Sequence, residues 1–419
     1  MPPTRELDAV ARPPVLSCPM ATVLEGVHVL EVADWGFVPS AAAALGDWGA
    51  EVIKVEHPRH GDPIRGLITG GVIPGASGRN FIVEQIGRQK RSVGIDLNTD
   101  DGRALLYRLV ERADVFLTNF LPDARERLRI TYEDLQRVNP RLVYAKGHGQ
   151  GARGPDARRG GFDAVSFWGR GGIGDRLSGP GPYVQQRPAF GDFIGGMCIA
   201  GGVAAALFQR ERSGRGIEVD VSLLGTAMWV MSPDIVAALM YGGLLPSSGE
   251  MRFTPNPLVG NYACADGKTI ILMMLQAERF WPHFAETIGR QDLLERWPTS
   301  EARQTGRQEI ADELTRHFAT RPSNEWADIL RRSECIWGPL QSPLDLPEDP
   351  QVQANGYLLD SPSAEGTVRV CANPVQFGGE PPVVRRAASD AGAHTEEVLL
   401  ELGCSWEDIA RWKEAGVVA

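Results

Sequence analysis

Apolar and polar positions along the first 150 residues follow a pattern typical of strands that alternate with helices. Short apolar runs of strand length are separated by longer segments in which apolar residues recur every three or four positions. Strand, helix and strand follow one another within about thirty residues, which predicts βαβ units and a parallel sheet. The expected strands are Val27–Val32, Glu51–Glu56, Ser92–Leu97, Asp114–Leu117 and Leu142–Lys146, and the expected helices are Ser40–Leu45, Asp101–Glu111 and Thr131–Val138.

The pattern changes after this region. Ten glycines lie between Gly147 and Gly174, without a long periodic segment, and a long loop of this kind inside a compact domain is usually functional or disordered. An Asp-Gly turn signal then predicts a hairpin within an α+β region from about 255 to 335. The other predicted elements are a helix at Gly195–Gln209, a strand at Ile217–Ser222, a helix from Leu223 to about Met240, a linker at Ser342–Gly356 and a helical segment at Thr395–Gly416.

Composition limits the classes of function. The 419 residues carry a formal net charge of -10, which argues against a general nucleic-acid binder because such proteins present a basic face. A local basic pocket for a small anion is still compatible with this charge. The 48 glycines and 30 prolines exceed average usage and indicate many tight turns.

Cysteine usage and the apolar segments predict a cytoplasmic protein that does not enter a membrane. The six cysteines are scattered without C-x-x-C spacing, which fits reduced thiols. The first twenty residues contain charges and prolines but no apolar core, so we expect a disordered extension rather than a secretory signal. The most apolar stretch, Ile194–Phe208, is too short to cross a bilayer.

A basic run precedes one predicted strand. Arg88-Gln89-Lys90-Arg91 holds three cations in four residues, and such a run either binds phosphate or forms a solvated turn. A G-x-x-x-x-G-K-[ST] loop is absent, and the first βα turn lacks G-x-G-x-x-G. A Rossmann dehydrogenase is therefore not expected.

His148 and Lys146 stand at the end of the strand Leu142–Lys146. Ligand sites in parallel sheets gather at the carboxyl ends of strands, so both residues are candidates for chemistry, and the alternative for His148 is a hydrogen-bonded turn residue. No group of Cys, His or Asp residues has the spacing of a metal site, and we predict no metal.

Two aspartates stand directly before apolar runs, Asp163 in Gly160-Gly161-Phe162-Asp163 and Asp192 in Phe190-Gly191-Asp192. The simplest interpretation of each is a helix N-cap. A carboxylate that follows two glycines at a helix start is also accessible to a substrate, so Asp163 is the foremost candidate for catalysis. For Asp192 the cap interpretation is favoured.

Taken in order, these motifs resemble the family III CoA-transferases, which include formyl-CoA transferase, carnitine CoA-transferase and the α-methylacyl-CoA racemases. The resemblance runs from about Gly26 to the C-terminus and is nearest to the subgroup that acts on 2-hydroxyacids. The segments that carry it are Gly26–Glu31, Gly49–Glu56, Arg88–Leu97, Ala113–Val115, Asn119–Phe120, Asn139–Tyr144, Gly161–Asp163, Phe190–Asp192, Arg212–Val221 and His394–Gly403.

The resemblance implies an α/β fold with a Rossmann-like large domain, a smaller α+β domain and an interlocked homodimer of linked rings. The domains then follow as a disordered extension at 1–22, a large CoA-binding domain at 23–225, a linker helix with the small domain at 226–340, and a return segment at 341–419 that completes the large domain.

The resemblance also implies a reaction. Asp163 would attack an acyl-CoA thioester and give an aspartyl anhydride, and CoA thiolate would then form an enzyme-CoA thioester that passes CoA to a free carboxylic acid. Acyl-CoA and a small acid are the implied substrates, without a tightly bound cofactor. His148 is a candidate auxiliary residue, and the candidate CoA contacts are Arg127, Lys146, Asn119, Phe120, Lys90 and Arg91.

Two departures from the family pattern bear on the substrate. Gly36 stands where formyl-CoA transferases carry a Gln, which argues against oxalate as the acceptor. Phe162 stands where the racemases carry a His. A racemase or isomerase that uses Asp163 and His148 as an acid/base pair is the alternative enzyme, and a non-catalytic CoA-binding protein is the alternative of another class.

Overall fold

The computed structural model describes residues 22–73, 78–179, 181–246, 256–363 and 366–419, so the predicted extension at 1–22 lies almost entirely outside the described residues. The chain forms two compact units. The larger comprises the described residues up to Gly171 together with Gln186–Val230 and Tyr357–Ala419. The smaller comprises Gly172–Gln185 and Met231–Gly356.

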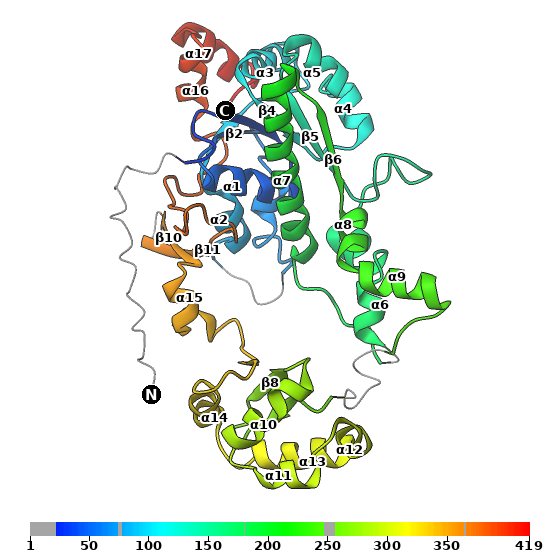
Figure 1. The fold of residues 1–419 in the computed structure, drawn as a ribbon. Helices are drawn as coiled ribbons and strands as arrows, with labels where there is room; N and C mark the ends of the chain where they lie inside the picture. The colour runs from blue at the N-terminus through cyan, green and yellow to red at the C-terminus, as the bar shows by residue number, and fades with distance from the viewer. Residues whose placement is uncertain (1–21, 74–77, 180, 247–255, 364–365) are drawn as a thin grey trace, which may run out of the picture. The chain divides into compact units, whose positions relative to one another are not determined.

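A six-stranded parallel sheet forms the centre of the larger unit, in the order β3-β2-β1-β4-β5-β6 (Figure 1). This is the order of a Rossmann-type sheet, and the α/β prediction is confirmed. The predicted strands occur within a few residues of their expected positions. The strands are β1 (His28–Val32), β2 (Glu51–Glu56), β3 (Lys90–Gly94), β4 (Val115–Thr118), β5 (Val143–His148) and β6 (Glu218–Ser222).

Helices cover both faces of this sheet. One face packs on α3 (Asp100–Arg112), α5 (Tyr132–Val138), α16 (Thr395–Glu401) and α17 (Trp406–Glu414), which share a core with the strands. The C-terminal segment is tied to this core, because the Asp96 backbone N–H donates to the Val417 carbonyl at 2.8 Å. The other face carries α1 (Phe37–Asp47) and α7 (Phe190–Ser213), which run side by side (Figure 1).

Helix α7 is longer than the sequence pattern predicted, because its first turn, Phe190-Gly191-Asp192, includes a glycine and an aspartate and so lacks a helical apolar pattern. Among the described residues, α7 is the one helix that is long and apolar enough by itself to span a membrane, and 44% of its most apolar window is buried within the protein. Core helices pass the same test. The expected single helix from Leu223 to Met240 is instead two, α8 (Leu223–Val230) and α9 (Ser232–Tyr241), because Pro233 cannot continue the first.

Short elements complete the two units. The predicted hairpin is present in the smaller unit as β7 (Val259–Ala263) and β8 (Thr269–Met273), with β9 (Trp337–Pro339) as a third strand. The helices of this unit are α6 (Ile173–Ser178), α9, α10 (Ala277–Thr287), α11 (Asp292–Arg296), α12 (Ser300–Thr305), α13 (Arg307–Phe318), α14 (Ser323–Leu330) and α15 (Pro350–Ala354). The larger unit also contains α2 (Phe81–Gly87), α4 (Pro122–Leu128) and the antiparallel pair β10 (Leu358–Ser363) and β11 (Gly366–Cys371).

Candidate active site at the switch point of the sheet

A cavity of about 290 Å³ opens beyond the carboxyl ends of β1 and β4. The strand order reverses between these two strands, so their following turns diverge and leave a crevice where open α/β sheets bind ligands. Both turns contribute to its wall, as do the end of β5 and the glycine-rich loop. The lining residues are Trp35, Phe37, Asn119, Phe120, Leu121, Gly147, His148, Gly149, Ala157, Arg159, Gly160, Gly161, Phe162, Asp192 and Leu223.

Asp163 lies beside two lining residues, Phe162 and Asp192. It occupies the position before a π-helical turn (Ala164–Gly169) but makes no side-chain cap to it. The amide of Gln186 donates to the Asp163 carboxylate, as do the backbone N–H groups of Ala164, Gly191 and Asp192. Burial raises the pKa of Asp163, and these donors oppose but do not cancel that rise.

Two of these donors belong to the first turn of α7, where N–H groups have no partner within the helix. The carboxylate thus receives both their hydrogen bonds and the positive end of a 24-residue helix. Gly191 permits this approach, because a Cβ atom at that position would lie 2.4 Å from the Phe167 ring. Asp163 therefore accepts hydrogen bonds at the start of a helix that is distant from it in sequence.

Asp192 is the second carboxyl at the cavity. The sequence favoured an N-cap role for it, and this is wrong, because α7 begins at Phe190 after the left-handed Ala189 (φ 61°) and Asp192 lies within the first turn. Its Oδ2 atom lies 2.5 Å from the place where a Cβ atom of Gly36 would be. Burial, reinforced by the charge of Asp163, raises the pKa of Asp192 to about 8.

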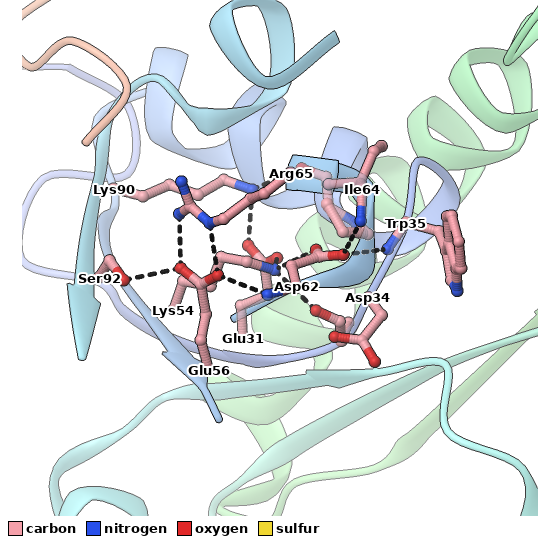
Figure 2. A network of polar contacts seen from close by, with 12 residues as sticks. Glu31, Asp34, Trp35, Lys54, Glu56, Asp62, Ile64, Arg65, Lys90 and Ser92 are labelled. Carbon is pink, nitrogen blue, oxygen red and sulfur yellow. Dashed lines mark hydrogen bonds and ion pairs between the residues drawn. The ribbon is translucent and has the colours of Figure 1, made fainter. Parts of the chain in front are cut away.

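A buried network of charges supports the turn after β1 (Figure 2). Lys54 Nζ lies 2.7 Å from a Glu31 oxygen and 2.9 Å from Asp62 Oδ2. The other Asp62 oxygen accepts the backbone N–H of Trp35 at 3.0 Å. Trp35 has a left-handed backbone (φ 67°), and its indole packs edge-on against the Phe162 ring at 5.3 Å between centroids. The network thus holds an aromatic wall of the cavity next to the candidate nucleophile.

Lys90 belongs to this network and not to the cavity. Its Nζ lies 2.6 Å from Glu31 Oε2 and donates to the Pro39 carbonyl at 2.8 Å. Burial lowers the pKa of Lys90 to about 8. Its charge is balanced by Glu31 in this network, and the predicted contact of Lys90 with CoA stays a prediction.

Arg91 lies away from the cavity, and its predicted contact with CoA stays a prediction. It stands at the start of β3, whereas the cavity lies at the carboxyl ends of the strands, and its guanidinium pairs with Glu397 at 3.0 Å and Glu401 at 2.7 Å. Arg127 lies exposed on α4, which begins directly after the lining residue Leu121. The predicted contact of Arg127 with CoA stays a prediction.

Three other predicted residues gather at the cavity. Phe120 and Asn119 line it, and the Asn119 side chain accepts the Asp34 N–H at 3.0 Å and donates to the Asp34 carbonyl at 2.6 Å. His148 lines it as well, with its Nε2 atom 3.3 Å from Asp220 Oδ2. The structure therefore brings Asn119, Phe120 and His148 together with Phe162-Asp163.

Lys146 stands behind His148 rather than in the wall of the cavity. Its Nζ lies 3.4 Å from Asp220 Oδ2 and also pairs with Glu218. Burial would raise the pKa of Asp220, but His148 and Lys146 outweigh it and hold that pKa below its usual value.

Sequence reasoning missed two residues at this site. Arg159 lines the cavity and was signalled only by the Arg158-Arg159 pair before Gly160-Gly161. Gln186, which holds Asp163 from 23 residues away, had no signal of its own, because nothing local distinguishes it from other glutamines in a loop.

Comparison with known proteins agrees with the predicted family. The pattern that defines CoA-transferase family III matches residues 24–395. The chain is 33% identical to (R)-2-hydroxy-4-methylpentanoate CoA-transferase of Clostridioides difficile, over 94% of this chain and 99% of that protein. It is 31% identical to cinnamoyl-CoA:phenyllactate CoA-transferase of Clostridium sporogenes, over 92% and 95%.

A solved structure shares the fold. The crystal structure of a CAIB/BAIF family protein from Brucella suis superimposes with a TM-score of 0.75 at 27% identity, and the match covers 91% of this chain and 100% of that one. The parallel sheet, the cavity beside Asp163 and these matches agree. The chain belongs to CoA-transferase family III and is a CoA-transferase whose substrates are CoA thioesters.

Proposed function

We propose that the protein moves CoA from an acyl-CoA thioester to a free carboxylic acid, with Asp163 as the nucleophile. The main support for this proposal is the environment of the Asp163 carboxylate. It lies beside the cavity and receives hydrogen bonds from the start of α7. Within the described part of the chain it forms no ion pair with Lys or Arg. The N–H donors favour the ionised form of the carboxyl group, which has a lone pair for attack.

The reaction balances without another reactant. Asp163 attacks the thioester carbonyl, the C–S bond breaks, and an aspartyl acyl anhydride and CoA thiolate form. The thiolate attacks the Asp163 carbonyl and releases the donor acid as a carboxylate. The acceptor carboxylate then attacks the enzyme-CoA thioester, and the returning thiolate transfers to the acceptor acyl group and frees Asp163.

The start of α7 supplies the electrostatic part of catalysis. Negative charge develops on an Asp163 oxygen whenever thiolate or carboxylate adds to its carbonyl. The N–H groups of Gly191 and Asp192 already point at this carboxyl, so they are pre-organised for that charge. One such donor contributes about 3–4 kcal/mol in comparable sites.

The walls of the cavity suit a 2-hydroxyacid with an apolar side chain. Trp35, Phe37, Phe120 and Phe162 offer aromatic surface, and His148 and Asn119 offer polar groups to a hydroxyl. Two relatives are named for 2-hydroxy-4-methylpentanoate and phenyllactate, which belong to this class. For CoA itself, Arg159 at the cavity and the exposed Arg127 are the cations that we assign to its phosphates.

Trapping tests the nucleophile. The protein is incubated with an acyl-CoA and hydroxylamine, and peptides are analysed by mass spectrometry for an aspartyl hydroxamate. We expect the modification at Asp163 in the wild type and in the Asp175→Asn control, whose carboxyl is exposed on α6. Modification elsewhere, or none while transfer proceeds, contradicts the proposal.

A racemase or isomerase is the second candidate, because His148 lines the same cavity as Phe162 and Asp192 and could exchange the α-proton of a bound thioester. The same incubation in deuterium oxide separates the two. Solvent deuterium at the α-carbon without modification of Asp163 favours the racemase.

The interlocked homodimer is part of the proposal. Each unit exposes large apolar side chains that a second copy could cover: in the larger unit Trp229 is 78% exposed, and in the smaller unit Leu239 is 80% exposed. A second copy that covered these side chains would remove apolar surface from water, which favours association. Sedimentation equilibrium at twice the chain mass supports the dimer, and a monomer at micromolar concentration contradicts it.

A further inference from the structure

We propose that His148 selects free acids that carry a hydroxyl group on carbon 2, and that Asp220 is a positioning residue that fixes the orientation of the His148 ring. The inference rests on the proposed transfer reaction and names the side chain that distinguishes one free acid from another. The hydroxyl donates a hydrogen bond to a ring nitrogen of His148, and no covalent bond changes in this contact.

His148 lies close to the loop that carries Asp163. It is the last residue of β5, and it lines the cavity together with Phe162. The next residue, Gly149, packs against that loop, since a Cβ atom at Gly149 would lie 2.7 Å from the Gly161 Cα atom. Carbon 2 is bonded directly to the carboxyl carbon of the acid, so a side chain that recognises its hydroxyl must lie near the reacting groups, as His148 does.

The other polar side chains that line the cavity are less suited to a hydroxyl. Both polar atoms of the Asn119 amide bind the Asp34 backbone, at 3.0 and 2.6 Å. Arg159 has a fixed charge, which suits a phosphate better than a neutral group. Asp192 lies at the proposed nucleophile, to whose carboxylate its backbone N–H donates. The His148 imidazole is therefore the group that we assign to the hydroxyl.

Asp220 orients the imidazole. Strands β5 and β6 run parallel with Lys146 opposite Asp220, and His148 lies on the same face as Lys146 because side chains alternate along a strand. The buried Nε2 atom of His148 lies 3.3 Å from Asp220 Oδ2. An ionised carboxylate has no proton to donate, so it favours the proton on Nε2. The lone pair of an uncharged ring is then on Nδ1, where the hydroxyl can donate to it.

Lys146 keeps Asp220 in its ionised form. Its Nζ atom lies 3.4 Å from Asp220 Oδ2. Burial favours protonation of Asp220, but His148 and Lys146 outweigh it and hold the pKa of this carboxyl below its usual value. Because Lys146 supplies a positive charge to Asp220, an uncharged His148 suffices as the second partner of the carboxylate.

The test is a competition between two acids that differ only in the hydroxyl. Equal amounts of ¹³C-labelled 2-hydroxy-4-methylpentanoate and ¹³C-labelled 4-methylpentanoate are incubated with the protein and unlabelled 4-methylpentanoyl-CoA at about pH 8, where an ordinary imidazole is uncharged. Mass spectrometry follows the two labelled thioesters, and the ratio of their initial rates is the ratio of kcat/KM. We expect the wild type to favour the hydroxyacid by about tenfold or more.

Variants of the two residues should change this preference. His148→Phe should bring the ratio close to one by slowing the hydroxyacid and not the acid without a hydroxyl. His148→Gln should recover part of the preference, because its amide oxygen can accept the hydroxyl hydrogen. Asp220→Asn should lower the preference several-fold, because an amide no longer fixes the tautomer. Glu218→Gln is the matched control, since Glu218 also pairs with Lys146, and it should keep the wild-type ratio.

Two results overturn the selection of the hydroxyl by His148: equal rates for the two acids in the wild type, or a wild-type ratio in His148→Phe. A ratio in Asp220→Asn equal to that in Glu218→Gln overturns the positioning role of Asp220. Failure of the transfer function gives a different result, because neither labelled acid then becomes a thioester. In that case the proposal falls with the function, whereas transfer to both acids at equal rates leaves the function in place.

Discussion

Two groups of carboxyl side chains lie at the carboxyl ends of the strands, and they differ in whether a cation is their partner. In the network beneath Trp35, each of Glu31, Glu56 and Asp62 contacts Lys54, Arg65 or Lys90. Beside the cavity, Asp163 and Asp192 have N–H donors or apolar surroundings, and within the described residues neither has a cationic partner.

The pKa values follow from this difference. Burial alone would raise the pKa of Glu56, but Arg65, Lys54 and Ser92 lower it to about 2. Burial is not compensated in this way at Asp192, whose pKa rises to about 8. Paired carboxyls therefore serve the fold, and the unpaired ones stay available for substrate. Trp35 joins the two groups, because its backbone binds Asp62 and its ring packs on Phe162.

The largest effect is expected at the nucleophile. Asp163→Ala should lower kcat/KM by at least about 10³-fold, because neither the anhydride nor the enzyme-CoA thioester can form. Steady-state transfer assays measure this loss, and circular dichroism checks that the fold is kept. Full activity in this variant would rule out Asp163 as the nucleophile.

The paired network should matter for stability. Lys54→Met leaves Asp62 buried without its cation, so we expect the free energy of unfolding to fall by about 3–5 kcal/mol. Arg158→Ala breaks an exposed pair with Asp123 and Glu126 and should leave the free energy of unfolding nearly unchanged, because water and salt screen exposed pairs. Urea denaturation compares the two variants, and equal losses would remove the distinction between buried and exposed pairs.

A smaller effect is expected from crowding Asp192. Gly36→Ala places a methyl group against the Asp192 carboxyl and should lower kcat/KM by about 10- to 100-fold through displacement of that group. Gly201→Ala is the control, because a Cβ atom there meets nothing within 4 Å. Unchanged kinetics in Gly36→Ala would show that the carboxyl tolerates displacement.

The smallest effect is expected at Arg91. Since this residue pairs with Glu397 and Glu401 away from the cavity, Arg91→Ala should change the KM of acyl-CoA by less than about twofold, whereas Arg159→Ala should raise it about tenfold through loss of a phosphate contact. Initial rates at varied acyl-CoA distinguish them. If Arg91→Ala raises the KM of acyl-CoA more than Arg159→Ala does, the CoA phosphates bind at the amino ends of the strands.

Local sequence patterns were sufficient for the sheet and for part of the site. The buried strands have apolar runs, and Asn119 and His148 follow strands that end at the same edge, so their meeting could be anticipated. Gly161-Phe162-Asp163 was distinctive as a motif of the family.

Pairing between distant residues could not be predicted in the same way. The run Arg88–Arg91 has the composition of a phosphate site, and only the folded chain brings Glu31 to Lys90 and Glu397 to Arg91. Asp192 shares its local pattern with ordinary helix caps. Its different role comes from Gly36 and Asp163, which the fold brings close from 156 and 29 positions away.

Isotope transfer tests the central claim most directly. If the Asp163 carbonyl receives the acceptor acid, one oxygen of that acid stays on Asp163 after each cycle. The protein is incubated with acyl-CoA and an acid labelled with ¹⁸O in its carboxyl group, and the peptide that contains Asp163 is analysed by mass spectrometry. We predict that this peptide gains ¹⁸O while the peptide that contains Asp192 does not. Turnover that leaves Asp163 unlabelled would contradict the mechanism.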